Sequence, residues 1–348
     1  MSCSFENSAP EDICIVRLSA IGDTCHALAV VRNLQDNWPD ARITWIIGTT
    51  EAGLLGDIPD VEFITFDKAG GSAAYTDVRR QLAGRRFDVA LCMHASLRAN
   101  LLCRLIPSVH KIGFDRARAR DFQWLFTNSR IPHAKGEHAL EAMMGFARFI
   151  GARATELRWD IPVADADRRF ADAHRGDPTV VISPCSSQRS RNFRNWPVER
   201  FIQVANYLRE RYGATIVLTG GSSALERDYA GQIGVATGAD NQVGNTSLQQ
   251  LFALLAAADL VICPDSGPAH MATAAGTAVV GLYATSNPDR TGPYLSRQHC
   301  ANRYPDAVRR YLGKDVRDIR WGRRVRHPDA MGLITVDEVK SKIDDILG

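Results

Sequence analysis

The chain has 348 residues, a length that favours two domains over one. Hydrophobic residues make up 45% and charged residues 23% of the sequence, which is the composition of a globular protein able to bury sizeable cores, and the net charge of +3 does not indicate a general polyanion-binding protein. No apolar run reaches the roughly 20 residues that cross a bilayer. The polar N-terminus has no signal-peptide pattern, so we expect a cytoplasmic protein.

Short β-rich runs alternate with helical patterns in the first half of the chain. The predicted strands are 13–18, 42–47, 61–66, 87–94 and 110–114, and the predicted helices are 24–37, 73–83, 96–106 and 137–151. This alternation predicts a parallel sheet with helices on both faces.

The pattern breaks at the polar stretch 152–179, which we interpret as the connection between two domains. A second alternating half follows. Its predicted strands are 179–183, 214–220, 259–264 and 278–283, its predicted helices are 197–211, 223–234, 247–257 and 268–275, and an amphipathic helix closes the chain at 335–347. The simplest architecture is α/β, with two doubly wound domains facing a central cleft.

The turn after the first strand, RLSAIGDTCHALAVV (17–31), is where an α/β domain often has a glycine-rich phosphate loop. This turn has a single glycine, Gly22, followed by the carboxylate of Asp23. A helix dipole favours the charged form of a carboxylate at this position, so Asp23 is a candidate general base for an acceptor hydroxyl. The alternative is that Asp23 only caps the helix 24–37.

Two loops of the second half contain groups that suit a phosphate. The loop SPCSSQRSRNFRNWP (183–197) carries the hydroxyls of Ser186 and Ser187 and the guanidinium groups of Arg189, Arg191 and Arg194. The loop LTGGSSALERD (218–228) has Gly220 and Gly221, which permit close approach of a nucleotide, but it lacks the dinucleotide and P-loop patterns. A solvated basic loop is the alternative for the first of these.

The sharpest pattern is ADLVICPDSGPAHMATAAGTAVVGLY (258–283), a buried strand followed by Asp265, Ser266 and Gly267 and then by a helix of small residues. Free N–H groups and the dipole at the start of this helix suit a diphosphate, and the carboxylate suits sugar hydroxyls. The alternative is a capped helix without a ligand. His270 is either a further donor or a surface histidine.

Basic residues also cluster in the first half, in HKIGFDRARARDFQWLF (110–126). Lys111, Arg116, Arg118 and Arg120, preceded by Arg98 and Arg104, suit an anionic acceptor or an anionic membrane surface, and a solvated surface is the alternative. The same two interpretations apply to the basic segment RRYLGKDVRDIRWGRRVRH (309–327). No nucleic-acid-binding module accompanies these residues, so we expect no nucleic-acid partner.

The segments RLSAIGDTCHALAVV, SPCSSQRSRNFRNWP and GNTSLQQLFALLAAADLVICPDSGPAHMATAAGTAVVGLYATSNPDRTGPY together resemble the family 9 glycosyltransferases. These are the lipopolysaccharide heptosyltransferases, and the resemblance is to the heptosyltransferase I type. It implies a GT-B fold with an acceptor domain at 1–165, a nucleotide-sugar domain at 166–334, and a C-terminal helix at 335–348 that packs back on the first domain.

The resemblance further implies transfer of a heptose from ADP-L-glycero-β-D-manno-heptose to the Kdo/lipid A inner core, with inversion and without cofactor or essential metal. The partners are then this nucleotide sugar and an anionic lipid acceptor, met at the inner face of the inner membrane, where the protein would be peripheral. Asp23 and Arg194 are the implied catalytic residues. The donor-binding residues are Ser186, Ser187, Arg191, Gly220, Asp265, Ser266, Gly267 and His270, and the acceptor-binding residues are Ser19, Gly22, His94, Arg98, Lys111, Arg116, Arg118 and Arg120.

Three alternatives stay open at this point. A nucleotide-sugar epimerase of similar build also needs a diphosphate loop, but it needs no base in the first domain. A related transferase would use another nucleotide sugar. A non-catalytic sensor of nucleotide sugars would bind the donor without transferring it.

Overall fold

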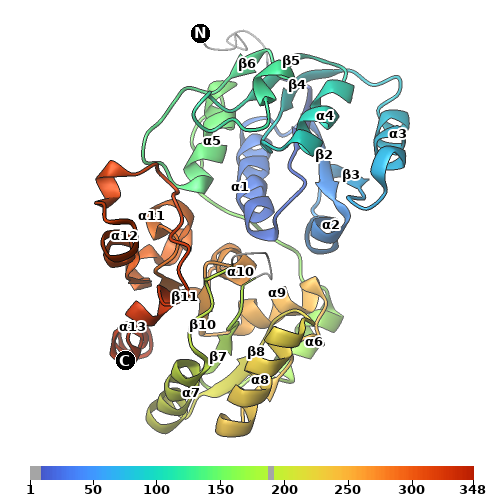
Figure 1. The fold of residues 1–348 in the computed structure, drawn as a ribbon. Helices are drawn as coiled ribbons and strands as arrows, with labels where there is room; N and C mark the ends of the chain where they lie inside the picture. The colour runs from blue at the N-terminus through green and yellow to red at the C-terminus, as the bar shows by residue number, and fades with distance from the viewer. Residues whose placement is uncertain (1–8, 187–191) are drawn as a thin grey trace. The chain divides into compact units, whose positions relative to one another are not determined.

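The computed structural model describes residues 9–186 and 192–348. The chain divides into two compact units, Met1–Pro162 and Val163–Gly348. Each unit contains one parallel six-stranded sheet with helices on both faces (Figure 1). The predicted α/β class with two doubly wound domains is therefore confirmed.

In chain order the strands of the first sheet are β1 (Asp12–Val16), β2 (Arg42–Gly48), β3 (Val61–Phe66), β4 (Phe87–Leu91), β5 (Ser108–Gly113) and β6 (Ser129–Arg130). The central strands β1, β2 and β4 are apolar and mostly buried, whereas the outer strands β3, β5 and β6 are more exposed. They pair in the order β3-β2-β1-β4-β5-β6, and β1 pairs with both β2 and β4 in parallel. Near-continuous apolar runs such as β1 and β2 are what the middle of a sheet covered on both faces requires.

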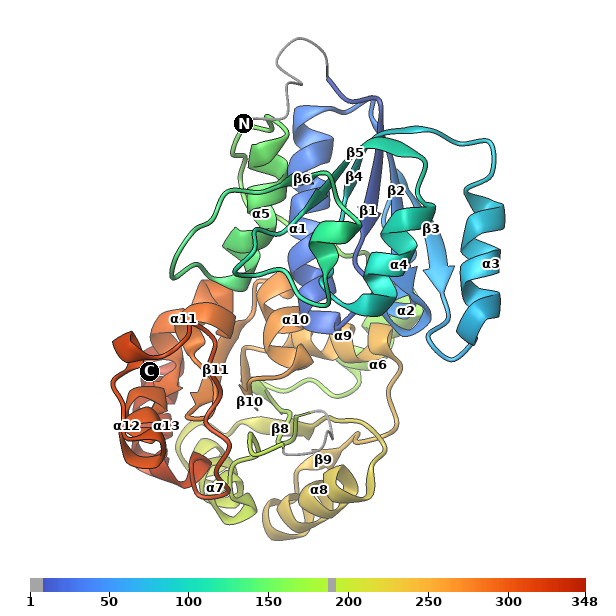
Figure 2. The same cartoon turned by 45° about the horizontal axis from the view of Figure 1, so that its top comes forward.

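The helices of this unit lie in two layers: α1 and α5 pack together on one face of the sheet, and α3 and α4 cover the core on the other face (Figures 1 and 2). Their bounds are α1 (Ile21–Asn37), α2 (Thr49–Leu55), α3 (Gly71–Gln81), α4 (Leu97–Leu105) and α5 (Ala139–Phe149), with a 3₁₀ turn η1 at Gln123–Leu125. Helix α1 is buried over most of its length because it packs between the sheet and α5.

The sheet of the second unit repeats this plan. Its strands are β7 (Thr179–Ile182), β8 (Thr215–Leu218), β9 (Asp240–Asn241), β10 (Leu260–Pro264), β11 (Ala278–Tyr283) and β12 (Ala301–Asn302). They pair in the order β12-β11-β10-β7-β8-β9. Numbered from its own first strand, this is the same order as in the first unit.

The helices of the second unit also cover both faces of its sheet, with α7, α8 and α13 in one layer and α6, α9 and α10 in the other (Figure 2). Their bounds are α6 (Asp165–Asp172), α7 (Val198–Tyr212), α8 (Ala224–Thr237), α9 (Leu248–Ala257), α10 (Gly267–Ala275), α11 (Pro288–Thr291), α12 (Tyr304–Leu312) and α13 (Val336–Leu347), and short 3₁₀ turns lie at Tyr294–His299, Val316–Asp318 and Met331–Leu333.

Strand order locates the place where a ligand is expected in each unit. In both sheets the connections run in one direction from the first strand and in the other direction from the fourth, so β1/β4 and β7/β10 are topological switch points. Ligands of open α/β sheets bind outside the carboxyl ends of the strands at such points.

Two expectations from the sequence differ from the structure. The polar stretch 152–179 is not only a connection, because it contains α6, which packs on α9. Helix α6 buries only Ala171, so its sequence carries too small an apolar stripe to reveal it.

The C-terminal helix α13, expected to pack back on the first domain, belongs to the second unit. Val339 and Ile343 are buried in the core that lies beneath α7. Glu338 pairs with Arg303 at 2.5 Å, and Asp344 accepts a hydrogen bond from the hydroxyl of Tyr207 at 2.6 Å. The apolar face of this helix is thus taken up by the second core.

We expect Ile343→Ala to lower the free energy of unfolding by about 2–5 kcal/mol, because it removes a fully buried side chain from this core. Ser341→Ala, at an exposed position of the same helix, should change it by less than about 0.5 kcal/mol. Urea denaturation measures both values. Equal stability of the two variants would show that α13 does not complete the second core.

Candidate active site

The first candidate group lies in the turn that joins β1 to α1. Asp23 stands in the first turn of α1, with its side chain 40% exposed. Its Oδ2 forms an ion pair with Nη2 of the largely buried Arg17 and accepts a hydrogen bond from the backbone N–H of Ala20 at 3.4 Å. Arg17 also donates from Nη1 to the carbonyl of Met93, just beyond β4, at 2.7 Å. The guanidinium thus fastens the carboxylate to the switch point of the first sheet.

His94 lies on the β4 side of the same switch point. Its Nδ1 accepts a hydrogen bond from the backbone N–H of Leu18 at 3.2 Å, so a neutral ring carries its proton on Nε2. Burial, and after it the positive charge of Arg17, lowers the pKa of His94 to about 3. The ring is neutral at physiological pH. Ser19 and Gly22, also predicted to bind the acceptor, lie in the turn beside Asp23.

The structure gives two of the predicted acceptor-binding residues internal contacts. Arg118 pairs through Nε with the buried Asp115, pairs through Nη1 with Glu137 at 2.7 Å, and donates from Nη2 to the carbonyl of Pro132 at 2.6 Å. The Nζ of Lys111 lies 3.5 Å from a carbonyl oxygen of α4. An acceptor role for Arg118 does not fit these contacts, because they use the guanidinium to hold the loop between β5 and α5.

The other predicted basic residues stay at the surface. Arg116 and Arg120 are exposed and line a shallow pocket together with Phe122 and Trp124. Arg98 is exposed in the first turn of α4. Arg116 and Arg120 are therefore the two that the structure brings together.

In the second unit, the loop after β7 is organised around a buried serine. The hydroxyl of Ser186 lies 3.1 Å from Oδ1 of both Asn192 and Asn195, and its backbone N–H donates to Asn195 Oδ1 at 2.9 Å. These contacts fix the ends of the loop 186–195. Two predicted donor-binding residues, Ser187 and Arg191, lie outside the described residues.

Three charged side chains meet at the second switch point. Arg194, from the loop after β7, donates from Nη1 to the backbone carbonyl of Asp265, after β10, at 2.7 Å. The Oδ2 of Asp265 lies 3.7 Å from both Arg194 Nη1 and Arg324 Nη2. That oxygen is buried and has no hydrogen-bond donor among residues 9–186 and 192–348. A buried carboxylate oxygen of this kind is favoured when a ligand hydroxyl supplies the donor.

The other predicted donor-binding residues surround this cluster. Ser266 is the N-cap of α10, and its hydroxyl donates to the carbonyl of Pro264 at 3.0 Å rather than outward. Gly267 and His270 lie in the first turn of α10 and are partly exposed. At Gly220 a Cβ would make only ordinary contacts with Glu226 and Val243, so the loop does not require glycine there for its packing.

Sequence reasoning missed two residues that complete these clusters. Arg17 is a charged residue directly after the buried apolar strand β1. A charged residue at the carboxyl end of such a strand could have indicated a site residue. Arg324 was only one of many basic residues near the C-terminus. Its segment is anchored by Val325, which is buried and donates its backbone N–H to the carbonyl of Thr285, after β11, at 2.9 Å.

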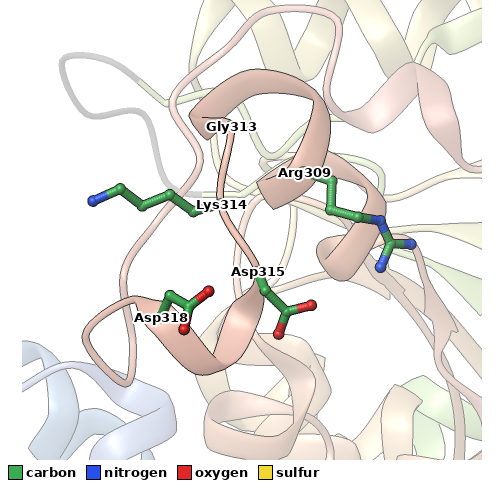
Figure 3. A pocket seen from close by; sticks show the side chains of 5 residues that line it. All are labelled: Arg309, Gly313, Lys314, Asp315 and Asp318. Atoms are coloured by element: carbon green, nitrogen blue, oxygen red, sulfur yellow. The ribbon is translucent and has the colours of Figure 1, made fainter.

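Other features of the described chain add no second site. The hollow beside the end of α12 is lined by Gly313 and by side chains of both charges, Arg309, Lys314, Asp315 and Asp318, and Figure 3 shows Arg309 and Lys314 pointing in opposite directions. Among residues 9–186 and 192–348 no group of three or more His, Cys, Asp or Glu side chains is placed to hold a metal. Each helix in that part of the chain is too short or too polar to span a bilayer.

Two doubly wound units, the second with arginines and a helix N-terminus at its switch point, form the architecture of a GT-B glycosyltransferase. The sequence model of glycosyltransferase family 9 (heptosyltransferase) matches residues 75–310. The chain is 37% identical over 335 residues to the lipopolysaccharide core heptosyltransferase OpsX of Haemophilus influenzae, an alignment that covers 95% of each protein. The chain belongs to glycosyltransferase family 9.

Solved structures agree with this fold. A family 9 glycosyl transferase from Veillonella parvula aligns with a TM-score of 0.77 at 22% identity and covers 97% of each chain. The heptosyltransferase WaaC of E. coli, solved with ADP, aligns with a TM-score of 0.73 at 20% identity and covers 96% of this chain and 99% of its own.

The low pKa of His94 predicts a specific loss of stability in acid. In the unfolded chain His94 is protonated as the pH falls below the ordinary histidine pKa of 6.5. In the folded chain it stays neutral down to about pH 3. The free energy of unfolding therefore decreases as the pH falls between these two values. Between pH 7 and pH 5 the wild type should lose about 2 kcal/mol more than His94→Asn, whose amide oxygen can still accept from Leu18.

Urea denaturation at the two pH values measures this difference, and NMR of the imidazole protons follows His94 directly, with the other histidines as internal references. Titration of His94 near pH 6.5, or identical pH profiles of the two proteins, would contradict the neutral assignment.

Proposed function

We propose that this protein transfers a heptose from ADP-L-glycero-β-D-manno-heptose to the Kdo/lipid A inner core of lipopolysaccharide, with inversion at the anomeric carbon. The relative from H. influenzae is a lipopolysaccharide core heptosyltransferase, and the E. coli structures of similar fold include WaaC with ADP and with ADP-2-deoxy-2-fluoro heptose. The observation that carries the proposal is the buried carboxylate of Asp265 between the guanidinium groups of Arg194 and Arg324, at the switch point beside the start of α10.

That cluster supports binding of the donor in residues 166–334. Two guanidinium groups and one carboxylate leave an excess positive charge, which suits a diphosphate. The first amides of α10 add donors and the positive end of the helix dipole. The Oδ2 of Asp265 accepts a hydrogen bond from a hydroxyl of the sugar. The rest of the donor is contacted by His270, Gly220 and the loop that contains Ser186, Ser187 and Arg191.

The chemical step is a direct displacement. Asp23 takes the proton from the acceptor hydroxyl while that oxygen bonds to the anomeric carbon, and the bond from the anomeric carbon to the diphosphate oxygen breaks on the opposite face. Negative charge develops on the departing ADP, where Arg194 and Arg324 stabilise it. Arg17 positions the base through its ion pair with Asp23.

The acceptor is bound by residues 1–165. His94 offers its neutral Nε2–H beside Asp23, and Ser19 and Gly22 shape the turn. Arg98, Arg116 and Arg120 are exposed and suit anionic groups at the lipid-anchored end of the acceptor. The acceptor is anchored in a bilayer, so the protein acts as a peripheral protein at the inner face of the inner membrane.

One assay tests the proposed reaction. The purified protein is offered a truncated lipid acceptor with a panel of nucleotide sugars, and the products are identified by mass spectrometry. We expect addition of one heptose from the ADP-linked donor only. Transfer from another nucleotide sugar would replace the donor assignment, and turnover of the donor without acceptor would indicate an epimerase.

The role of Asp23 makes a separate prediction. Asp23→Asn should lower kcat by about 10²–10⁴ because it removes the base. The affinity for ADP, measured by calorimetry, should change by less than about 0.7 kcal/mol because the donor is held by the other unit. The control is Asp88→Asn, which lies at the start of β4 and binds the backbone N–H of Glu11. Transfer by Asp23→Asn at the control rate would eliminate the base mechanism.

The role of Arg324 in donor binding makes a further prediction. Arg324→Ala should weaken ADP binding about tenfold, or about 1.4 kcal/mol, because one charged donor to the diphosphate is lost. Arg317→Ala, an exposed arginine of the same basic segment, should leave the affinity unchanged. Equal ADP affinity of these two variants would remove Arg324 from the site without affecting the assignment of Arg194.

A further inference from the structure

Exposed apolar side chains are concentrated in one part of the first unit. Among the described residues, six of the ten large hydrophobic side chains that are exposed lie between positions 97 and 125. Five of these form what we call the aromatic patch: Leu97 and Leu101 on α4, and Phe122, Trp124 and Leu125 on and beside η1. Exposed apolar residues gathered in this way mark an interaction surface rather than ordinary surface variation.

Hydrogen bonds join the two segments of the patch. The side chain of Asp121 accepts from the backbone N–H of Leu97 at 2.9 Å. The amide of Asn100, which is fully buried, donates to the carbonyls of Arg120 and Asp121 at 3.2 and 2.8 Å. These hydrogen bonds hold the turn before η1 against the first turns of α4, so the two segments of the patch are fixed relative to each other.

The backbone of this turn is strained so that Phe122 projects into solvent. The N–H of Gln123 bonds to the carbonyl of Arg120 at 3.1 Å, and the two residues between them, Asp121 and Phe122, have φ of +51° and +58°. Positive φ at both central positions is typical of type I′ turns, where glycine and asparagine are preferred. A left-handed conformation costs a residue such as phenylalanine about 1–2 kcal/mol. The ring of Phe122 is 65% exposed, so burial in this structure does not offset that cost.

The patch has a positive rim. Between positions 97 and 125 the exposed charged residues are Arg98, Arg104, Arg116, Arg120 and Asp121, and Asp121 already caps α4. Arg116 and Arg120 line the pocket that Phe122 and Trp124 share. Aromatic and aliphatic side chains ringed by arginines are the composition of a surface that enters the interface of an anionic bilayer.

The patch lies at the catalytic edge of the first unit. Gln123, at the start of η1, is fully buried and donates from Nε2 to the carbonyls of Cys92 and His94 at 2.9 and 3.4 Å. Its Oε1 accepts from the N–H of Phe114 at 3.1 Å. The patch is thus tied to the carboxyl ends of β4 and β5, the same edge that carries Asp23 and His94.

We propose that the aromatic patch docks this protein on an anionic lipid bilayer, with Phe122, Trp124 and Leu125 inserted among the headgroups and the neighbouring arginines on lipid phosphates. The inference rests on the proposed function in one respect: a lipid-linked acceptor requires the base to work beside a membrane. Insertion offsets the strain at Phe122, whose ring in the free protein contacts Trp124 but stays 65% exposed.

The test measures binding to vesicles of phosphatidylcholine with and without phosphatidylglycerol, by sedimentation of the full chain. The key variant is Phe122→Gly with Trp124→Ser. Glycine suits the φ of that position, so this variant should fold at least as well as the wild type by thermal unfolding. The matched control is Val235→Ser, which removes a 92% exposed side chain from the second unit.

We expect the wild type and the control to bind the anionic vesicles and the double variant to bind them about tenfold more weakly or less. Brominated lipids should quench tryptophan fluorescence in the wild type and much less in Trp124→Phe. Failure of the wild type to bind, or equal binding by the double variant and the control, would overturn the proposal.

Transfer assays separate this inference from the proposed function. The double variant should transfer sugar to a water-soluble truncated acceptor at the wild-type rate and lose activity on an acceptor embedded in vesicles. Equal activity of double variant and wild type on the embedded acceptor would overturn the docking role. Absence of transfer by the wild type to either acceptor would refute the proposed reaction, while vesicle binding would still decide whether the patch docks.

Discussion

The constraint on which the candidate site depends is the reversal of strand order in each parallel sheet. At β1/β4 and at β7/β10 the connections leave in opposite directions, so the loops at these strand ends separate and expose the edge between them. Side chains far apart in the sequence then meet there. Arg17 reaches Met93 and Arg194 reaches Asp265, across 76 and 71 positions of the chain. An antiparallel arrangement would send neighbouring strand ends to opposite edges, and neither cluster would form.

The two switch points differ in their balance of charge, and that difference suits different tasks. At the first, one arginine pairs with one aspartate and His94 is neutral, so the local charge is close to zero. At the second, Arg194 and Arg324 face the single carboxylate of Asp265, so the cluster has an excess positive charge. Buried charges are costly unless they are paired, which makes an anionic ligand a favourable partner at the second point, whereas the charges at the first point are already paired with each other.

The sequence was sufficient where the signal is local. Apolar runs predicted most strands of both sheets, and the Asp-Ser-Gly-Pro pattern predicted the start of α10 within a residue. The sequence was insufficient to predict contacts between side chains that are distant in the chain and are brought together only by the fold. The role of Arg118 depends on Asp115, Glu137 and Pro132, and only the loop between β5 and α5 brings these together. Arg324 meets Asp265 because Val325 is bonded to the chain beyond β11, a contact that no spacing reveals.

Stability and binding favour different residues at position 122. A turn with positive φ at both central residues folds best with glycine or asparagine, yet this one carries a phenylalanine whose ring is largely exposed. The buried amide of Asn100 holds the strained turn, although its Oδ1 has no hydrogen-bond partner among the described residues. The strain at Phe122 costs free energy in water, and the exposed ring gains nothing from the core. A surface that covers the ring offsets this cost. Arg116 and Arg120 beside the ring select an anionic surface, and Gln123 ties the turn to the edge that bears Asp23.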